Sequence, residues 1–397
     1  MLKAADALAR AGYIVRVVST RYIPWATAGD DAVRRERKGL WDWTVVDWGR
    51  RDALFLNRWS GARQHAANKL AKILGPTRSP LQLTAAARGR VHNELVRAAL
   101  SEPVDFFYGG GGALAATATA ARRAGVPYAI DLEDFHSAEQ DDTPQSRLAH
   151  ALTERIENAV LPGAAFLTAG SEAIAEAYVS KYGVHPVPIN NTFPLPSTIP
   201  DTTLNRDKAG LKLYWFSQTI GPRRGLEDAV RAMGLARISG ELHLRGQAVT
   251  EYLLKLKQLA KTVAPQLEIV HHLPASPDEM VRLCDGYDVG LAIEPGFSSN
   301  NLLALSNKAL TYILGGLAVV FTDTLGQRPL ALDISDGAFL YSPGDVETLS
   351  RGLKRWADDK AALTKAKRKA WEAAARRWHW EHPRERGALL KAVGLVI

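Results

Sequence analysis

The sequence predicts an α/β protein made of two doubly wound domains, and three observations support this. Short apolar segments rich in β-branched residues alternate with amphipathic segments of helical period. This alternation runs through the chain twice, as expected for two parallel sheets that are each covered by helices. With 397 residues, the chain is longer than one hydrophobic core usually supports and suits two domains of ordinary size.

Composition narrows the class of protein. Hydrophobic residues make up 46% and charged residues 23% of the chain, which is typical of a globular protein. No apolar run reaches the length of a membrane-crossing helix, and the first residues lack the layout of a signal peptide. The single cysteine, Cys284, forbids an internal disulfide and fits a reducing compartment. We therefore expect a cytoplasmic location.

The net charge of +8 favours an anionic partner. Nucleotide diphosphates, lipid phosphates and the inner face of a membrane all carry the complementary charge, so peripheral membrane association is one expectation. Nucleic acid is not expected, because the chain has neither zinc-finger spacing nor an aromatic RNA-binding motif, and its basic residues are dispersed.

The most informative stretch runs from Asp288 to Asp323 and reads as strand, loop, helix and strand. DVGLAI and LAVVFTD are apolar enough for buried parallel strands, and EPGFSSNN between them is a loop of breakers and small polar residues. Ser306 can cap the helix, which Gly315-Gly316 can end in a left-handed conformation. The stretch therefore predicts a compact βαβ crossover.

Ligands of such units bind beyond the carboxyl ends of the strands, beside helix N-termini. Backbone N–H groups at a helix start, together with one lysine, favour a phosphate. The polar candidates at this edge are Glu294, Ser298, Ser299, Asn300, Asn301, Asn307 and Lys308. An ordinary capped helix beside a solvated loop is the alternative that this spacing leaves open.

The segment NKALTYILGGLAVV, residues 307–320, resembles the donor site of family-4 glycosyltransferases. That resemblance implies the GT-B fold, two Rossmann-like domains facing a cleft. The glutamate that this family uses to hold the donor ribose falls on Thr311, and its partner eight residues earlier falls on Leu303. The usual Glu-x7-Glu pair is therefore altered, and Glu294 is the candidate replacement.

The resemblance continues at the start of the second domain, where LYWFSQ leads into a glycine loop and Arg224-Gly225 matches the family's Lys-Gly. It implies a UDP- or GDP-linked sugar donor, whose diphosphate is held without a metal ion. The donor-binding residues that it implies are Ser217, Gln218, Gly221, Arg224, Glu294, Gly296, Asn307, Lys308 and Thr311.

In the first half, YAIDLEDFHS (128–137) concentrates ionisable side chains where a strand ends, a place suited to acid–base chemistry. It resembles the acidic segment of the same transferases, which implies catalytic roles for Asp131, Glu133 and His136. Gly110, Gly111 and Asp134 would lie on the acceptor side, where glycines permit close approach to a ligand. An acidic helix-capping loop with His136 on the surface remains the alternative.

The predicted domains are 1–200 for the acceptor side and 201–372 for the donor side, with a helix in 373–397 that crosses back to the first domain. The family's first strand does not precede residues 1–20, so we expect either a start codon assigned too late or an absent element. Further helices are predicted at about 59–74, 81–100 and 277–287.

The resemblance implies a retaining glycosyltransferase that works without a metal ion. It would move a sugar from a nucleotide-sugar donor to a glycan or lipid-linked acceptor in cell-surface polysaccharide synthesis. Two other classes stay open: a non-catalytic nucleotide-sugar binder or scaffold, favoured by the altered glutamate pair, and a sugar-nucleotide 2-epimerase.

Overall fold

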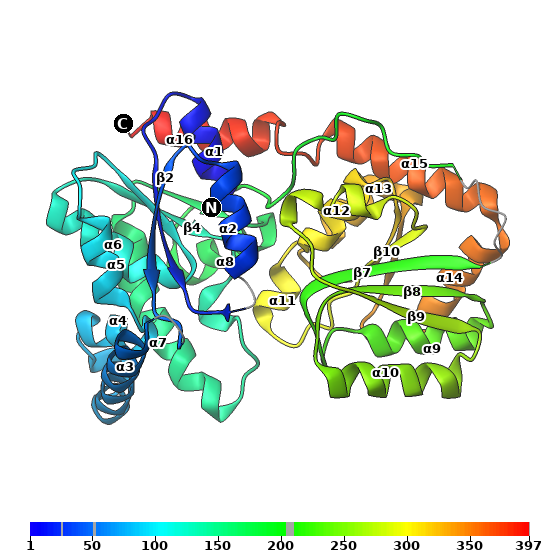
Figure 1. Cartoon of the computed structure of the whole chain (residues 1–397), viewed down its shortest axis with the longest axis horizontal. Coiled ribbons are helices and arrows are strands. Elements are labelled where there is room, and N and C mark those ends of the chain that lie inside the picture. Colours follow the sequence, from blue (N-terminus) through cyan, green and yellow to red (C-terminus); the bar gives the residue numbers. More distant parts are fainter. Residues whose placement is uncertain (25–26, 51–52, 204–209, 397) are drawn as a thin grey trace. The chain divides into compact units, whose positions relative to one another are not determined.

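The computed structural model describes residues 1–397 except 25–26, 51–52, 204–209 and 397 (Figure 1). It consists of two compact units, Met1–Ile189 with Pro383–Ile397, and Asn190–His382. Each unit combines parallel strands with helices, which confirms the predicted α/β class.

The unit boundaries differ from the predicted 200 and 372 because the start of unit 2 is bonded to the end of its last long helix. Thr192 Oγ1 donates to the carbonyl of Trp378 at 2.8 Å. The backbone N–H of Trp380 donates to the carbonyl of Phe193, also at 2.8 Å. These bonds keep residues 190–195 and 378–382 in one unit, while Pro383–Ile397 belongs to unit 1.

Unit 2 contains one parallel sheet of six strands in the order β12-β11-β10-β7-β8-β9. The strands are β7 (Leu211–Ile220), β8 (Gly240–Ala248), β9 (Leu267–His272), β10 (Val289–Ala292), β11 (Ala318–Thr322) and β12 (Ala338–Tyr341). The helices are α9 (Leu226–Ala236), α10 (Thr250–Val263), α11 (Ser299–Leu303), α12 (Asn307–Leu314), α13 (Arg328–Ile334), α14 (Val346–Asp358) and α15 (Lys360–Arg376).

Alternating residues of β7 divide the core of unit 2 into two layers. Leu213 and Trp215 pack with residues of α9, α10 and α14. Tyr214, between them in the sequence, packs instead with residues of α12, α13 and α15. Successive side chains of a strand point to opposite faces, so helices cover both faces of this sheet. β10 and β11 are buried along their whole length, as expected of central parallel strands.

Unit 1 contains two parallel sheets, β1-β2 and β3-β4-β5-β6. The strands are β1 (Arg16–Arg21), β2 (Asp42–Asp47), β3 (Phe107–Gly110), β4 (Tyr128–Leu132), β5 (Phe166–Ala169) and β6 (Val187–Pro188). The helices are α1 (Leu2–Arg10), α2 (Thr27–Glu36), α3 (Leu54–Leu74), α4 (Leu81–Arg88), α5 (His92–Ala99), α6 (Leu114–Ala124), α7 (Pro144–Val160), α8 (Glu172–Tyr182) and α16 (Ala388–Gly394).

In unit 1, the edge strands β1 and β3 are less buried than the inner strand β4. Among the described residues, β1 pairs only with β2, and β3 pairs with β4 alone. Every residue of β1 and β3 is half-buried. The resemblance expects a further strand before residues 1–20, and the described part of unit 1 contains none that joins the two sheets.

Two predicted helices took a different form. The segment 277–287 contains only two single turns of 3₁₀ helix, Pro277–Glu279 and Arg282–Cys284. Cys284 is fully buried against the end of α12, where a Cβ added to Gly315 would lie 2.3 Å from the Cβ of Cys284. Tertiary packing therefore outweighs helical propensity here. The predicted stretch 81–100 is divided at Gly89 into α4 and α5.

Among the described residues, no helix has both the length and the apolar character needed to cross a membrane.

Candidate functional site

In unit 2, Glu294 follows β10 and is the centre of a buried hydrogen-bond network. Lys308 Nζ lies 2.6 Å from Glu294 Oε1, and Ser306 Oγ donates to the same oxygen at 3.1 Å. Asn301 Nδ2 donates to Oε2 at 2.9 Å. The Asn301 side-chain oxygen accepts the backbone N–H of Gly296 at 2.6 Å, which also fixes the loop. The carboxyl end of β10 is thus tied to the first turn of α12.

Glu294 keeps its negative charge because the groups bonded to it stabilise the carboxylate more than burial destabilises it. Burial alone raises the pKa of this carboxyl, but Lys308 and the bonds from Asn301 and Ser306 lower it below its ordinary value. Glu294 is therefore a carboxylate at neutral pH. The Lys308 ammonium also lies 5.8 Å from the ring centroid of Trp215 in β7.

The predicted donor residues of α12 divide into exposed and buried positions. Asn307 is exposed at the start of the helix, and Lys308 is half-buried beside it. Thr311 is fully buried, and its hydroxyl donates to the carbonyl of Asn307 at 2.8 Å. Thr311 therefore does not present its hydroxyl to a ligand. Ser306 makes no side-chain cap and bonds to Glu294 instead.

The loop after β7 lies beside the loop after β10. A Cβ on Gly225 would touch the side chain of Ile293 at 3.5 Å. The guanidinium of Arg223 lies 5.4 Å from the ring centroid of Phe297. Arg223 has a φ of 61°, a left-handed value that costs free energy in a residue with a Cβ. Sequence reasoning missed Arg223, although its position next to Arg224 was a signal that could have found it.

The remaining predicted donor residues lie on the same side of unit 2. Ser217 and Gln218 fall within a β-bulge, where the β7–β8 register shifts between Phe216 and Thr219. Bulges redirect side chains near ligand sites. Gly221 is buried directly after β7, and Arg224 is half-buried at the start of α9. The loops after β7 and β10 thus gather most of the predicted donor residues at one edge of the sheet.

In unit 1, the carboxyl group of Asp131 is hydrogen-bonded to a pair of hydroxyl groups, those of Thr168 and Tyr108. Thr168 Oγ1 donates to Asp131 Oδ1 at 2.7 Å, and Tyr108 OH lies 2.6 Å from the same Thr168 oxygen. Burial raises the pKa of Asp131 above its ordinary value. A Cβ on Gly110 would lie 2.9 Å from the Asp131 carbonyl, so this glycine lets β3 approach β4 closely. Gly111 has a φ of 56°, which favours glycine.

His136 is buried, contrary to the surface position that the alternative interpretation expected. Its Nδ1 lies 2.5 Å from Glu139 Oε1. Burial lowers the pKa of His136, but Glu139 and the nearby Asp134 and Glu157 outweigh it and raise the pKa above its ordinary value. Nε2 is buried with no hydrogen-bond partner among the described residues. Glu133 is exposed in the loop before this pair.

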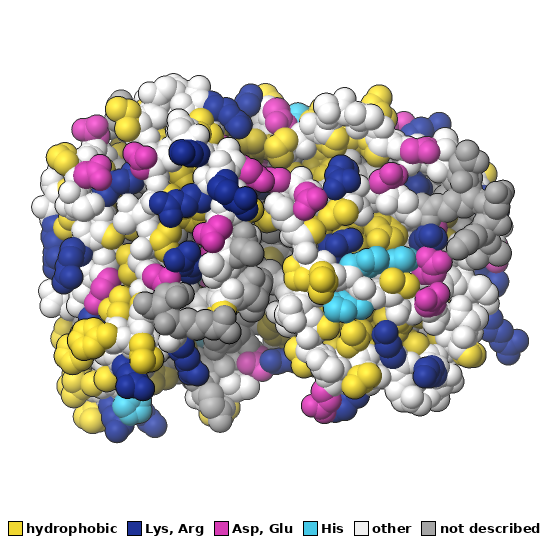
Figure 2. Space-filling view, in the orientation of Figure 1, with side chains coloured by type: hydrophobic (Ala, Val, Ile, Leu, Met, Phe, Trp, Pro, Cys, Tyr) yellow, Lys and Arg dark blue, Asp and Glu magenta, His cyan; other side chains and the backbone are white. Residues whose placement is uncertain are grey.

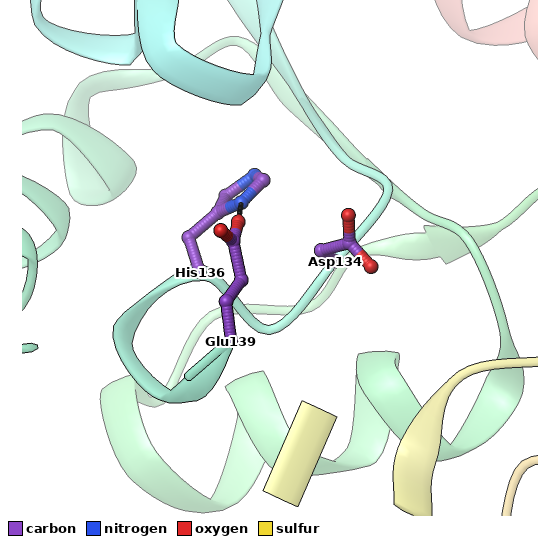
Figure 3. A group of neighbouring side chains, drawn as sticks. All are labelled: Asp134, His136 and Glu139. Atoms are coloured by element: carbon purple, nitrogen blue, oxygen red, sulfur yellow. Dashed lines mark hydrogen bonds and ion pairs between the residues drawn. The ribbon is translucent and has the colours of Figure 1, made fainter. Parts of the chain in front are cut away.

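Asp134, His136 and Glu139 form a group that could hold a cation. Each offers a ligand atom, and these atoms lie within 4.8 Å of one another. Figure 3 shows His136 joined to Glu139, while Asp134 stands to one side. A histidine that binds a metal must be neutral, so a cation would compete with the protonation that the raised pKa of His136 favours. His136 and Glu139 form a partly buried ion pair, in which the side chains are 8% and 43% exposed.

We expect His136→Gln to lower the melting temperature most between about pH 4.5 and 6.5. The raised pKa of His136 gives a stabilisation that is complete below its ordinary value of 6.5 and is lost as the pH rises through the folded value. Glu139 has a lowered pKa, so its contribution is complete above 4.5 and is lost in acid. Thermal unfolding across this range tests the window, and the effect should shrink in a Glu139→Gln background, where only Asp134 and Glu157 still raise the pKa of His136.

Comparison with sequences gave no match: neither a protein-family model nor a curated protein matches the chain. Solved structures do match. Sucrose-phosphate synthase from Thermosynechococcus elongatus has a TM-score of 0.66 at 13% identity, covering 99% of this chain and 90% of that one. HepE from Anabaena in complex with UDP has a TM-score of 0.58 at 15% identity, covering 96% and 99%.

A third match is the α,α-trehalose-phosphate synthase (UDP-forming) from Burkholderia xenovorans in complex with glucose-6-phosphate. Its TM-score is 0.61 at 14% identity, covering 96% of this chain and 99% of that one. At such identities the likeness establishes the fold alone. The chain therefore has the GT-B fold that the sequence predicted, with two units built on parallel sheets.

Proposed function

We propose that this chain is a glycosyltransferase that uses a nucleotide-sugar donor, UDP- or GDP-linked. The observation that carries the proposal is the loop after β10, which contacts both basic groups. Arg223 lies over Phe297 of this loop, and Lys308 of α12 pairs with Glu294 at its start. The fold is shared with HepE, whose structures contain UDP or UDP-glucose. Both facts support a nucleotide-sugar site in unit 2.

Positive charge at this edge suits the chemistry of a departing nucleoside diphosphate. Arginine presents a planar fork of donors that matches phosphate oxygens, and Arg224 and Arg223 are the candidates for this contact. Glu294 fixes the Lys308 ammonium at 2.6 Å, which leaves other donors of that ammonium for a phosphate. Fixed positive groups stabilise charge that develops on the leaving phosphate, and this proposal needs no metal ion.

In unit 1, the surroundings of two proposed catalytic groups, His136 and Asp131, shift their pKa values. Glu139 and other nearby acids raise the pKa of His136, which favours its protonated form and a role as hydrogen-bond or proton donor. Asp131 has a pKa raised by burial and is held by Thr168. The proposal also includes a glycan or lipid-linked acceptor and a retaining reaction. It further includes a role in polysaccharide synthesis and a cytoplasmic location, with the inner membrane surface among the places where the protein acts.

The decisive test is thermal unfolding of the full chain with UDP, GDP and ADP. A nucleotide at 100 times its Kd should stabilise the folded state by about 2.7 kcal/mol, which raises the melting temperature by several degrees. Arg224→Ala should lose most of this shift. The matched control is Arg231→Ala on α9, whose exposed side chain pairs only loosely with Asp228 at 3.7 Å. No shift with any nucleotide would refute the proposal.

A second function, a nucleotide-sugar binder without catalysis, is favoured by one observation. The positions of the altered glutamate pair carry Leu303 and Thr311, and the Thr311 hydroxyl is fully buried. Such a protein would show the same thermal shift but no consumption of donor in the presence of glycan or lipid-linked acceptors. Release of nucleotide from the donor therefore separates the two functions.

A further inference from the structure

Helix α3 of unit 1 presents large apolar side chains to solvent along its whole length. Phe55 is 83% exposed, Trp59 57%, Leu70 51% and Ile73 79%. Exposed alanines at 62 and 66 fill the interval between them. These positions follow one another at spacings of three or four residues, so they form one continuous stripe on the helix. We call this set, Phe55, Trp59, Ala62, Ala66, Leu70 and Ile73, the α3 stripe.

The arrangement of α3 is the reverse of an ordinary surface helix. Its buried residues are the small Ser60, Ala67 and Ala71. Ala67 and Ala71 pack with Ala87 of α4 and Leu152 of α7. A surface helix normally turns its large apolar residues inward. The large apolar residues of α3 are thus mostly outside the core of unit 1, and a continuous exposed apolar stripe of this kind marks an interaction surface.

The flanks of the stripe are basic. Arg58, Lys69, Lys72 and Arg78 are exposed in or just after α3. The sequence contains no aspartate or glutamate between residues 53 and 93. Figure 2 shows hydrophobic side chains gathered over α3 at the lower left, with Lys, Arg and His side chains beside them. Glu94 contacts α3, but it is already paired with Arg63 at 2.7 Å. The surface therefore combines an apolar stripe with exposed positive charge.

We propose that α3 docks on the surface of an anionic lipid bilayer, lying in the plane of the interface. An amphipathic helix of this kind buries its apolar face at the boundary between headgroups and acyl chains, while its basic residues contact lipid phosphates. Trp59 has the ring that favours this interface, and Lys69 and Lys72 can extend their charged ends to the headgroups.

A bilayer fits this surface better than a second copy of the chain. A symmetric pair through the α3 stripe would bring the basic residues Arg58, Lys69 and Lys72 of both copies into one interface. No acidic residue in 53–93 could balance them. Anionic lipid supplies that balance. The inference rests on the membrane location in the proposed function and names the surface that reaches the bilayer. It concerns unit 1 alone, so it can fail or succeed whatever nucleotide unit 2 binds.

The test is flotation of the full chain with vesicles of phosphatidylcholine, alone or mixed with phosphatidylglycerol. We expect binding to the mixed vesicles that weakens as salt is raised. The double variant Phe55→Ser and Ile73→Ser should reduce vesicle binding by more than about tenfold, because each substitution removes apolar surface that would be buried in the bilayer. Lys69→Gln with Lys72→Gln should reduce both binding and its salt dependence.

Leu332→Ser is the matched control, since Leu332 is 66% exposed on α13 of unit 2 and should leave vesicle binding unchanged. All variants replace exposed side chains, and an unchanged melting temperature checks that they fold. Absence of binding to mixed vesicles at low salt would overturn the proposal. So would a dimer that the Phe55→Ser and Ile73→Ser pair converts to a monomer without any vesicle binding.

Discussion

Lys308→Met is expected to lower the free energy of unfolding by about 3–5 kcal/mol at neutral pH. The Lys308 ammonium and the Glu294 carboxylate are 2.6 Å apart, and their side chains are only 14% and 11% exposed. Removing the lysine leaves a buried carboxylate with two neutral hydrogen-bond donors, Asn301 and Ser306. Urea unfolding, followed by a signal from unit 2, measures the loss.

The pH dependence of this loss follows from the lowered pKa of Glu294. A carboxyl with a depressed folded pKa contributes stability above its unfolded value and loses it as the pH falls through the folded value. The difference between the wild type and Lys308→Met should therefore shrink in acid. A wild type and variant that differ equally at acid and neutral pH would contradict the ion-pair explanation.

Two further variants isolate the pair. Adding Glu294→Gln to Lys308→Met should restore much of the lost stability, because no buried charge remains. Lys255→Met removes an exposed partner of Glu251 on α10, where the side chains are 73% and 79% exposed. It should give no measurable change. If Lys308→Met were as harmless as Lys255→Met, the buried network would not stabilise unit 2.

The sequence was sufficient for the βαβ unit around α12 because its signals are local. Two apolar runs predicted β10 and β11, and both are fully buried. Gly316 has a φ of 67°, the left-handed conformation expected just past the helix end. Helix caps, helix-breaking residues and hydrophobic periodicity depend on neighbours within a few residues, so they can be predicted from the sequence.

Local signals did not reveal how the side chains are paired. Glu294 and Lys308 were both singled out, but as separate contacts for a ligand rather than as partners across 14 residues. Ser306 looked like a cap, and Glu294 takes its hydroxyl instead. The expected loop 294–301 contains the start of α11, which Ser298 caps. Each outcome depends on which strands and helices are neighbours in space.

Glu139 shows the same limit in unit 1. The sequence pointed to Asp131, Glu133, Asp134 and His136, all within one short segment. The acid bonded to His136 Nδ1 is the later Glu139, brought close by a 3₁₀ turn that no spacing rule predicted. Whether His136 was exposed could not be decided from the segment either, because α7 and α8 bury it, with Glu157 and Tyr178 beside it.

Gly290→Ala is expected to lower the free energy of unfolding by about 1–3 kcal/mol, because it places a methyl group inside a filled core. An added Cβ would lie 2.2 Å from Cγ and 2.8 Å from Cβ of Tyr312, so rotation of the tyrosine ring alone cannot relieve the overlap. Tyr312 is fully buried, and its ring lies 5.5 Å from that of Phe216. The remaining relief is a shift of α12 away from β10.

Such a shift has a consequence beyond stability, because β10 carries Glu294 and α12 carries Lys308. Moving the helix lengthens the 2.6 Å contact between them, so Gly290→Ala should also weaken any nucleotide-induced rise in melting temperature. Gly29→Ala is the control: it lies in α2 with open space around it, and alanine there should stabilise by about 0.5–1 kcal/mol. A Gly290→Ala variant that is destabilised but keeps the full nucleotide shift would show that the ligand does not depend on the Glu294–Lys308 contact.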